Sequence, residues 1–285
     1  MSVYFKPSFI VDESIGIKVV SSFSGNSQKG LPTAPGTIIL NDLETGVATA
    51  IIGATYLTGL RTAAGSAVAC KYLTQDDIKS MLVYGGGLQA KLHIEVMLTV
   101  RPSIKTVYIL SRTKSNISKM VNEISPKYKG VSFEFENLDD NKISSILKSV
   151  DLIVTATSSD EPLFNGEELQ SRDKPLLICS VGSSRPANRE LDSTTIIKAN
   201  LIVDDINSTM VSGELAIPIK EGSITKSHIK GQIADVVSKK YNYNDHKNNL
   251  VTVYKSAGTS IQDIATANLV YKKAVQLNKG FKFDM

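Results

Sequence analysis

The sequence has few of the residues that mark metal centres, disulfide frameworks and membrane spans. It contains two cysteines, Cys70 and Cys179, both in apolar runs, which predicts buried free thiols in a reducing compartment. Its three histidines, His93, His228 and His246, share no metal-ligand spacing, so we expect no metal site. No apolar stretch approaches membrane-spanning length, and the first residues lack a signal-peptide pattern. We therefore predict a cytoplasmic protein.

Charge is also sparse. The 32 basic and 28 acidic residues give a net charge of +4, and the mean hydropathy is −0.02 with 42% hydrophobic residues. These values are typical of an ordinary globular protein. The lysines are scattered, with no basic block, so we expect neither nucleic acid nor a membrane surface as a partner.

The first part of the chain, residues 1–56, predicts a small and mostly antiparallel sheet. Segments 15–23, 36–42 and 46–52 are rich in β-branched residues and are separated by glycine and proline. The stretch Asp42–Gly46 is typical of a hairpin loop.

A long helix is predicted from Leu60 to Leu73, where alanine and other small residues dominate. Thr58 is placed to cap its N-terminus. Arg61 would then lie in the first turn, where a positive charge opposes the helix dipole. That unfavourable position indicates an anion facing Arg61.

Residues from about 81 onwards alternate between strand and helix patterns, as βαβ units do. Continuous apolar runs in this region are typical of strands buried on both faces of a parallel sheet. The pattern therefore predicts a Rossmann-type α/β domain. Expected strands cover 81–85, 106–112, 131–136, 151–157, 175–182, 200–205 and 251–258, and expected helices cover 89–100, 116–125 and 142–150.

The C-terminal part predicts a discontinuous second domain. Beyond Asp205 the helical segments are expected to be interrupted over 212–224, and the polar stretch 239–250 is expected to be a surface loop. An amphipathic helix over 260–277 is expected to return to the N-terminal sheet. We thus predict a domain of 1–58 with 259–285 and a Rossmann domain of 59–258.

A glycine-rich loop stands where a predicted strand meets a predicted helix. Gly85 allows a tight turn, Gly87 lets a pyrophosphate approach the backbone, and Ala90 lets helix and strand pack closely. The helix N-terminus then offers unpaired N–H groups to the phosphates. A purely structural turn is the alternative. The predicted phosphate-binding residues are Gly85, Gly86, Gly87, Leu88 and Gln89.

The end of the next predicted strand favours NADP(H) over NAD(H). NAD-binding proteins usually carry an acidic residue there, which accepts a hydrogen bond from the ribose 2′-hydroxyl. This chain has Ser111, Arg112 and Thr113, with Asn116 shortly after. A guanidinium group at that position suits a 2′-phosphate. The alternative is that Arg112 is a solvated residue at the strand end.

Lys18 is the one charged residue within the apolar segment 15–20. An unpaired ammonium on the buried face of a strand is costly, so a buried Lys18 would need a partner or a ligand. Strand alternation alone cannot assign its face, and the residue type favours a solvent-facing lysine.

The chain resembles the ornithine cyclodeaminase/μ-crystallin family, and the matching segments follow the family order over nearly the whole chain. The resemblance implies a Rossmann domain joined to a smaller, discontinuous α/β domain that binds substrate and forms a homodimer. The matching segments are Lys18 in GIKVVSSF, Arg61-Thr62-Ala63-Ala64 with Ser66-Ala67, GGGLQA at 85–90, VTATSSDEPLF at 154–164, SVGSSRPANRELD at 180–192 and KSAGTSIQDIA at 255–265.

The resemblance also implies residue roles. Lys18 and Arg61 would hold the substrate carboxylate and serve catalysis, and Ser184 would stand at a further substrate position. The glycine-rich loop would bind the pyrophosphate. The remaining cofactor-binding residues implied are Thr62, Thr155, Thr157, Val181 and Ser256.

Two chemistries diverge within this family. Cyclodeaminases carry an aspartate shortly after the Val181-Gly182 motif, where this chain has Ser184. The stretch up to Pro186 and the pair Arg112-Thr113 are instead similar to the μ-crystallin branch, whose members are NADPH-dependent ketimine reductases. The resemblance thus implies reduction of a cyclic imine carboxylate by NADPH. An ornithine cyclodeaminase or alanine dehydrogenase, and an NADP-binding protein without turnover, are the alternatives.

Family members carry a further N-terminal stretch before the segment that starts here at Met1. That stretch supplies strands and another arginine near the carboxylate. We therefore expect a chain that is short for the family, with a changed dimer surface, and an inactive truncated form is a further alternative.

Overall fold

The computed structural model describes residues 1–135, 140–183, 185–243 and 250–282 and shows two compact units. The small unit comprises Met1–Arg61 and Thr259–Met285, and the large unit comprises Thr62–Gly258. The predicted α/β class is confirmed, because the described residues form one parallel sheet and one separate antiparallel sheet. None of the helices in the described ranges is long and apolar enough to cross a membrane.

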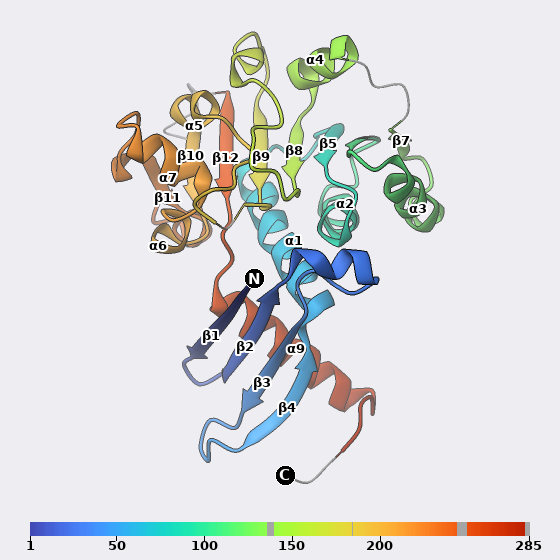
Figure 1. Cartoon of the computed structure of the whole chain (residues 1–285), viewed down its shortest axis with the longest axis vertical. Coiled ribbons are helices and arrows are strands. Elements are labelled where there is room, and N and C mark those ends of the chain that lie inside the picture. The colour runs from blue at the N-terminus through green and yellow to red at the C-terminus, as the bar shows by residue number, and fades with distance from the viewer. Residues whose placement is uncertain (136–139, 184, 244–249, 283–285) are drawn as a thin grey trace. The chain divides into compact units, whose positions relative to one another are not determined.

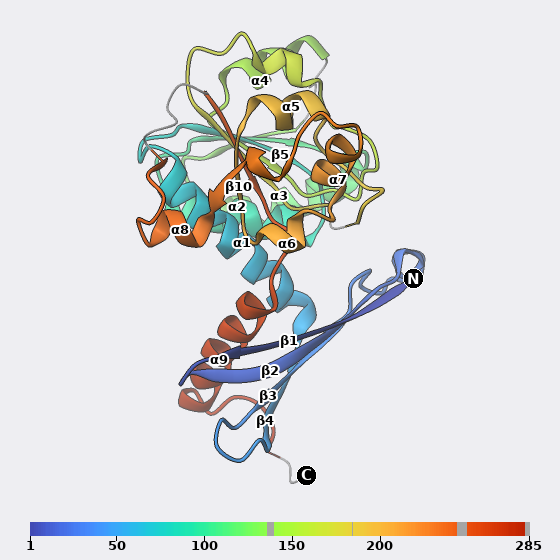
Figure 2. The same cartoon turned by 90° about the vertical axis from the view of Figure 1, so that its left-hand side faces the viewer.

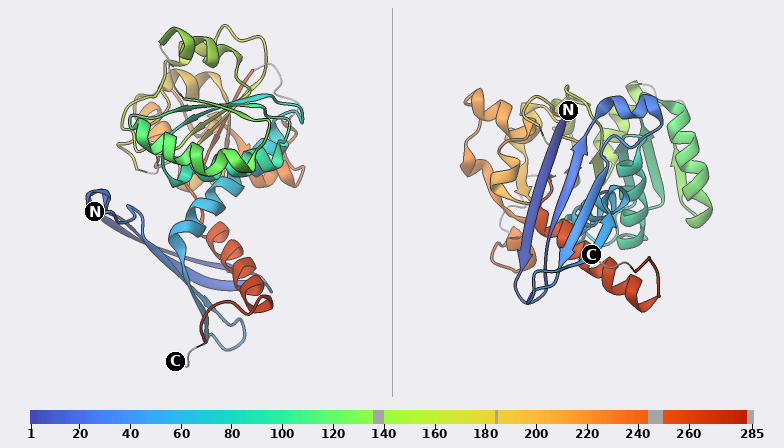
Figure 3. Two further views of the ribbon diagram at one scale, coloured as in Figure 1. Left: turned by 90° about the vertical axis from the view of Figure 1, so that its right-hand side faces the viewer. Right: turned by 60° about the horizontal axis from the view of Figure 1, so that its bottom comes forward.

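The small unit is an antiparallel sheet with a helix on one face. The sheet order is β1-β2-β3-β4 (Figures 1 and 3). Helix α9 packs on β1, β2 and β3, as expected for the C-terminal helix. Gly16 allows this close approach, because a Cβ there would lie 3.2 Å from the Ile264 side chain. The elements are β1 (Ser2–Ile10), β2 (Ser14–Ser22), β3 (Gly36–Asn41), β4 (Ala48–Gly53) and α9 (Ser260–Gln276).

The β3–β4 hairpin turns where the sequence predicted it. β3 pairs antiparallel with β4, and the Asp42 carboxylate accepts backbone N–H groups of Glu44 and Thr45. Gly46 has φ of 72°, a left-handed value that glycine adopts without strain. The strand β1 was not foreseen, because its polar and apolar residues give no clean periodicity.

Helix α1 (Ala54–Leu73) begins earlier than predicted, immediately after β4. Thr58 is therefore inside the helix, and the prediction that it caps the N-terminus is wrong. A β-branched residue inside a helix is tolerated where packing compensates its low propensity. Ala54 and Leu57 supply that packing, since both join Ile38 and Ile264 in the apolar core of the small unit.

The large unit is built on an eight-stranded parallel sheet with the order β11-β10-β12-β9-β8-β5-β6-β7. Its central strands are almost completely buried, as their continuous apolar runs predicted. The strands are β5 (Ser80–Tyr84), β6 (Thr106–Leu110), β7 (Ser132–Glu134), β8 (Leu152–Thr155), β9 (Leu176–Ser180), β10 (Asn200–Val203), β11 (Ile229–Gln232) and β12 (Val251–Lys255).

Helices cover both faces of this sheet (Figure 2). One apolar core forms under α2, α3 and α8, and the other forms under α4, α5 and α7. Residues 213–220 form a helix that contains Pro218, so the predicted interruption over 212–224 is wrong for these residues. The strand β11 was not predicted from the sequence. The helices are α2 (Leu88–Val100), α3 (Lys114–Ile124), α4 (Asp140–Ser149), α5 (Ser193–Lys198), α6 (Ile206–Thr209), α7 (Gly213–Lys220) and α8 (Ile233–Val237).

Candidate functional site

Two basic side chains of the small unit share one carboxylate. Lys18 on β2 places Nζ 2.6 Å from Oδ1 of Asp263 on α9, and Arg61 on α1 places Nε 2.8 Å from the same oxygen. Lys18 is 1% exposed and Asp263 is fully buried. The prediction of a solvent-facing Lys18 is therefore wrong, because the even-numbered residues of β2 face α9, and α9 provides the partner.

Arg61 lies about two turns into α1, not in its first turn. The predicted first-turn position of Arg61 is therefore wrong, and the helix dipole gives no reason for a facing anion there, because the dipole acts within the first turn. The anion that Arg61 contacts is Asp263. Its Nη1 also donates to Oε1 of Gln262 at 3.1 Å, so α9 fixes the guanidinium by two neighbouring residues.

The charges in this cluster do not cancel. Lys18 and Arg61 carry two positive charges against the single negative charge of Asp263. Burial lowers the pKa of Lys18 to about 8, and Arg61 adds to that effect, while Asp263 opposes it. At neutral pH the ammonium is therefore mostly protonated. The arrangement can bind an anionic group such as a carboxylate.

The glycine-rich loop of the large unit has the geometry of a phosphate cradle. Gly85 has φ of 134°, and a Cβ there would lie 2.7 Å from the Ala156 carbonyl oxygen. Gly87 precedes α2 as its N-cap residue and gives it no side-chain cap, and a Cβ at Gly87 would meet open space. Ala90 is fully buried against the sheet. Unpaired N–H groups at the start of α2 and the open space above Gly87 fit a dinucleotide pyrophosphate.

The residues after β6 lie beside this loop. Gly86 faces Ser111, whose Oγ would be 3.1 Å from a Cβ at Gly86. Arg112, Thr113 and Asn116 are exposed. No acidic residue stands between β6 and α3, so a guanidinium group is available at the position where a ribose substituent would lie.

The other predicted cofactor residues of the large unit gather at the carboxyl ends of adjacent strands. Thr155 ends β8, and Thr157 follows it; Val181 follows β9, and Ser256 follows β12. Since β12, β9, β8, β5 and β6 are neighbours in the sheet, these residues share one edge with the glycine-rich loop. Leu88 and Gln89 open α2 at that edge, and Thr62 is buried on α1.

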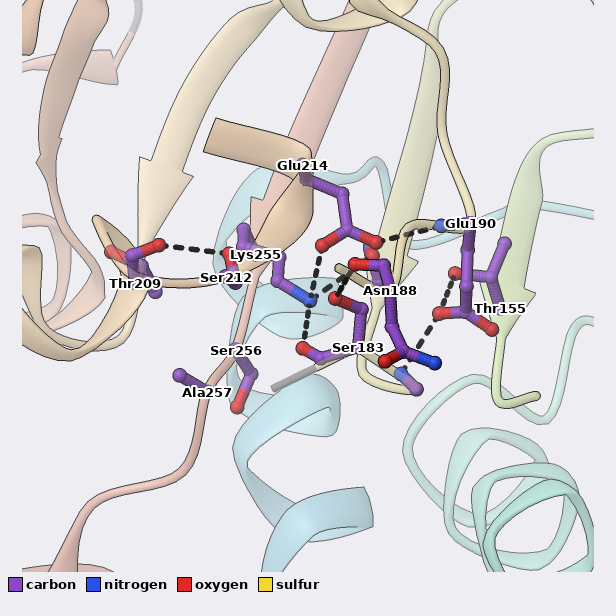
Figure 4. A network of polar contacts seen from close by, with 12 residues as sticks. Thr155, Ser183, Asn188, Glu190, Thr209, Ser212, Glu214, Lys255, Ser256 and Ala257 are labelled. Carbon is purple, nitrogen blue, oxygen red and sulfur yellow. Dashed lines mark hydrogen bonds and ion pairs between the residues drawn. The ribbon is translucent and has the colours of Figure 1, made fainter. Parts of the chain in front are cut away.

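Glu190 ties the ends of β8 and β9 together (Figure 4). This carboxylate is fully buried. Oε1 accepts the backbone N–H of Thr157 at 2.6 Å, and Oε2 accepts the Thr155 hydroxyl and the Gly182 N–H, each at 2.8 Å. Burial raises the pKa of Glu190, and Lys255 and these hydrogen bonds oppose the rise.

A buried lysine extends this network. Lys255 at the end of β12 donates to the Ser183 carbonyl oxygen at 2.7 Å and forms an ion pair with Glu214 at 3.2 Å. Glu214 also accepts the Glu190 N–H at 2.8 Å. The network thus fixes the loop that follows β9 up to Ser183. Ser184, predicted at a substrate position, lies outside the described residues.

A further carboxylate holds the segment after β12. Asp204 accepts the Ser256 hydroxyl at 2.8 Å and the Gly258 N–H at 2.7 Å. Ser256 is therefore held in place by a residue that follows β10.

No role was predicted from the sequence for the acidic members of these clusters, which are Asp263, Glu190, Glu214 and Asp204. Lys255 was predicted only as part of a strand. Lys255 carried a usable signal, because a charged residue at the end of a continuous apolar run must find a partner. Asp204 carried the same signal, because it follows the buried apolar run of β10. Asp263, Glu190 and Glu214 carried none, since none of them ends such a run.

Comparison with known proteins places the chain in a family. The model of the ornithine cyclodeaminase/mu-crystallin family matches residues 5–278. The chain belongs to the ornithine cyclodeaminase/mu-crystallin family. A member from Dictyostelium discoideum, named an uncharacterized cyclodeaminase, is 55% identical over 302 aligned positions, covering 100% of this chain and 82% of that protein.

Other relatives in the ornithine cyclodeaminase/mu-crystallin family carry names of reductases and dehydrogenases. A Delta(1)-pyrroline-2-carboxylate reductase from Bacillus thuringiensis subsp. konkukian is 32% identical, covering 95% of this chain and 81% of that protein. The structure of the Thermococcus litoralis Delta(1)-pyrroline-2-carboxylate reductase with NADH and L-proline aligns with a TM-score of 0.89 and 32% sequence identity, covering 99% of this chain and 84% of that chain. The structure of an archaeal alanine dehydrogenase dimer with bound NAD aligns with a TM-score of 0.87 and 28% sequence identity, also covering 99% of this chain and 84% of that chain.

Proposed function

We propose that this chain is an NADPH-dependent reductase of cyclic imines that carry a carboxylate. The observation that carries the proposal is the buried cluster in which Lys18 and Arg61 together face one carboxylate among the described residues, that of Asp263. The positive charge left over suits the carboxylate of an imino acid. Relatives of this chain are reductases named for such a substrate.

The cofactor we propose is a nicotinamide dinucleotide, since the related structures hold NADH or NAD. A bound nicotinamide would supply the hydride. We propose NADPH because Arg112 stands where NAD-binding proteins usually have an acidic residue. A guanidinium group attracts a 2′-phosphate, whereas a carboxylate would repel it.

The chain's own residues bind, orient and protonate. Lys18 and Arg61 would hold the substrate carboxylate with two charge-assisted contacts, which fixes the orientation of the adjacent C=N carbon. The C=N nitrogen must be protonated to accept a hydride, and Lys18 can supply that proton because burial lowers its pKa to about 8. Glu190 would hold Thr155 and Thr157 against the nicotinamide.

Similarity to the μ-crystallin branch supports reduction rather than deamination. It rests on the stretch from Gly182 to Pro186, with Ser184 in place of an aspartate, and on Arg112-Thr113. Reduction of a preformed C=N bond needs little acid–base machinery beyond one proton. Loss of that aspartate is consistent with this simpler reaction.

We also propose that two copies of the chain associate through the small unit. Within the small unit, the sheet face opposite α9 carries exposed apolar side chains: Phe5 and Phe9 on β1 are 68% and 56% exposed, and Ile51 on β4 is 52% exposed. A second copy is the occupant we propose, because the similar archaeal alanine dehydrogenase is a dimer. Exposed apolar faces of this kind typically mark association surfaces.

Cyclodeamination is the second candidate, because the relative that is 55% identical is named a cyclodeaminase. A panel of substrates separates the two. Piperideine-2-carboxylate and pyrroline-2-carboxylate would be assayed with NADPH and NADH, and ornithine with NAD⁺, each followed by dinucleotide absorbance and by ammonia release. We expect NADPH oxidation with the cyclic imines. Release of ammonia and proline from ornithine, with no imine reduction, would establish the second candidate instead.

A further inference from the structure

The two oxygens of Asp263 have different surroundings. Oδ1 accepts from Lys18 at 2.6 Å and from Arg61 at 2.8 Å. Oδ2 is buried and has no hydrogen-bond partner among the described residues. All the hydrogen bonding of this carboxylate to the two cations therefore passes through one oxygen.

Asp263 is the negative group that faces Lys18 from the elements packed around it. On β1, Lys6 stands directly opposite Lys18 in the strand register, and its charge disfavours protonation of Lys18. On α1, Arg61 acts in the same direction, and Thr58 accepts a weak hydrogen bond from Nζ at 3.4 Å. On α9, Asp263 alone favours the charged ammonium.

Two cations that share a buried site repel each other strongly unless a carboxylate lies between them. Without that charge the less costly outcome is that the lysine loses its proton, because an arginine keeps its proton at any ordinary pH. The pair would then lose one of its two charges and part of its attraction for a carboxylate ligand.

We propose that Asp263 is a positioning residue that keeps Lys18 protonated and holds it together with Arg61 as one carboxylate-binding group. The identity of the ligand rests on the function proposed above. The pairing of the three side chains does not, since their contacts lie entirely within the small unit.

Because Oδ2 has no hydrogen-bond partner among the described residues, the charge of Asp263 can be removed without removing its contacts. In the variant Asp263→Asn the amide oxygen can take the place of Oδ1 and accept both hydrogen bonds, while the amide nitrogen occupies the place of the oxygen that has no partner. The substitution therefore removes the charge and leaves both contacts in place. Asp76→Asn is the control, because Asp76 is an exposed carboxylate in an ion pair of the large unit.

The direct measurement is the titration of Lys18 by ¹³C NMR on full-length protein labelled at lysine Cε, with Lys18→Arg identifying the signal. We expect Lys18 to titrate near pH 8 in the unaltered chain, as burial and Arg61 dictate. In Asp263→Asn it should titrate lower by about one unit or more. Asp76→Asn should leave it unchanged. An unchanged or raised value in Asp263→Asn overturns the proposal.

A second variant decides the matter if Asp263→Asn does not fold. Arg61→Met removes the competing cation and leaves Asp263 to Lys18 alone, so Asp263→Asn can be introduced in that background without leaving two cations unpaired. Lys18 should then titrate lower in Arg61→Met with Asp263→Asn than in Arg61→Met, since Asp263 favours the charged ammonium. Equal values in the two variants would show that the carboxylate has no hold on Lys18, and the proposal would be wrong.

Ligand binding gives an independent readout. L-proline affinity in the presence of NADP⁺ would be measured by calorimetry at pH 6 and pH 8.5. A fall of about one unit in the pKa of Lys18 predicts binding weaker by roughly eightfold at pH 8.5 and by less than about twofold at pH 6 in Asp263→Asn. An equal loss at both pH values contradicts the proposal. If the unaltered chain does not bind proline, the proposed function fails, and the titration alone decides the role of Asp263.

Discussion

The small unit and the large unit each bury a cluster of charges, and the two clusters are built in opposite ways. In the small unit two cations, Lys18 and Arg61, share the single carboxylate of Asp263. In the large unit one cation, Lys255, forms an ion pair with Glu214, and its charge also acts on the carboxylate of Glu190. One cluster has two basic groups for one carboxyl group, and the other has two carboxyl groups for one basic group.

The clusters differ in what surrounds the group that is in excess. In the large unit, both carboxylate oxygens of Glu190 accept hydrogen bonds from backbone N–H groups or hydroxyls of the chain itself. Among the described residues, the Arg61 guanidinium bonds only to the carboxylate of Asp263 and the amide oxygen of Gln262. A buried charge that the chain satisfies holds loops in place, whereas one that the chain leaves in excess is suited to a ligand.

The largest expected effect comes from removing a cation of the small unit. Arg61→Ala should lower kcat/KM for the imine by about 100- to 1,000-fold, because a buried charge-assisted contact to a carboxylate contributes roughly 3–4 kcal/mol. NADP⁺ affinity, measured by fluorescence titration, should remain within about twofold. An equal fall in both quantities would show that Arg61 supports the fold rather than the substrate.

Removing the charge of the large-unit network should instead affect the fold. In Glu190→Gln the amide would set an N–H donor against the N–H of Thr157 or of Gly182, which should cost roughly 2–3 kcal/mol in the free energy of unfolding. Glu167→Gln, at an exposed ion pair, should change it by less than about 0.5 kcal/mol. Urea unfolding measures both variants, and similar values for the two would remove the distinction between the clusters.

The apolar face of the small unit should control association. Phe5→Glu should convert the dimer to a monomer in light scattering at low micromolar concentration, since it buries a charge in the proposed interface. Phe281→Glu is the matched control, because Phe281 is 99% exposed outside the sheet. A dimer that persists in Phe5→Glu places the interface elsewhere.

Cofactor choice should depend on a residue of the large unit that takes no part in its buried network. Arg112→Ala should weaken NADP⁺ binding about tenfold, through the loss of one charge-assisted contact, and leave NAD⁺ binding unchanged. Lys129→Ala, at an exposed lysine away from the glycine-rich loop, is the control. Equal losses for the two dinucleotides in Arg112→Ala would mean that Arg112 does not read the 2′-phosphate.

The smallest expected effect is a pH dependence that belongs to the small unit alone. Lys18 loses its charge as the pH rises through about 8, so binding of a cyclic carboxylate that lacks nitrogen should weaken roughly fourfold between pH 7 and pH 8.5. Such a ligand does not titrate in this range. NADP⁺ binding should stay flat over the same range, and a flat profile for the carboxylate would exclude Lys18 from its site.

Much of the large unit could be predicted from sequence, because local signals specify it. Apolar runs marked the buried strands, and Gly85, Gly87 and Ala90 stand between β5 and α2 as their spacing indicated. The start of α1 was misplaced because Thr58 looked like a cap, although packing of Ala54 and Leu57 extends the helix. Pro218 was the reason for predicting an interrupted helix, but it lies within α7, where tertiary packing accommodates it.

The charge clusters could not be predicted, because their members are distant in sequence. Lys18 and Asp263 are separated by 245 residues, and Thr155 and Glu190 by 35. Alternation along β2 left the face of Lys18 open, and only the position of α9 resolves it. Composition and periodicity specify which residues are buried, but not which distant carboxylate a buried lysine meets.

Isotope transfer tests the central claim most directly, because it follows the hydride itself. The full chain would be incubated with piperideine-2-carboxylate and NADPH that carries deuterium at C4, in separate 4R and 4S forms, and the product analysed by mass spectrometry. We predict pipecolate with one deuterium at C2 from one of the two forms, and labelling slower by about 100-fold or more with Arg61→Ala. Unlabelled product from both forms, or conversion of ornithine without any transfer to the imine, would contradict it.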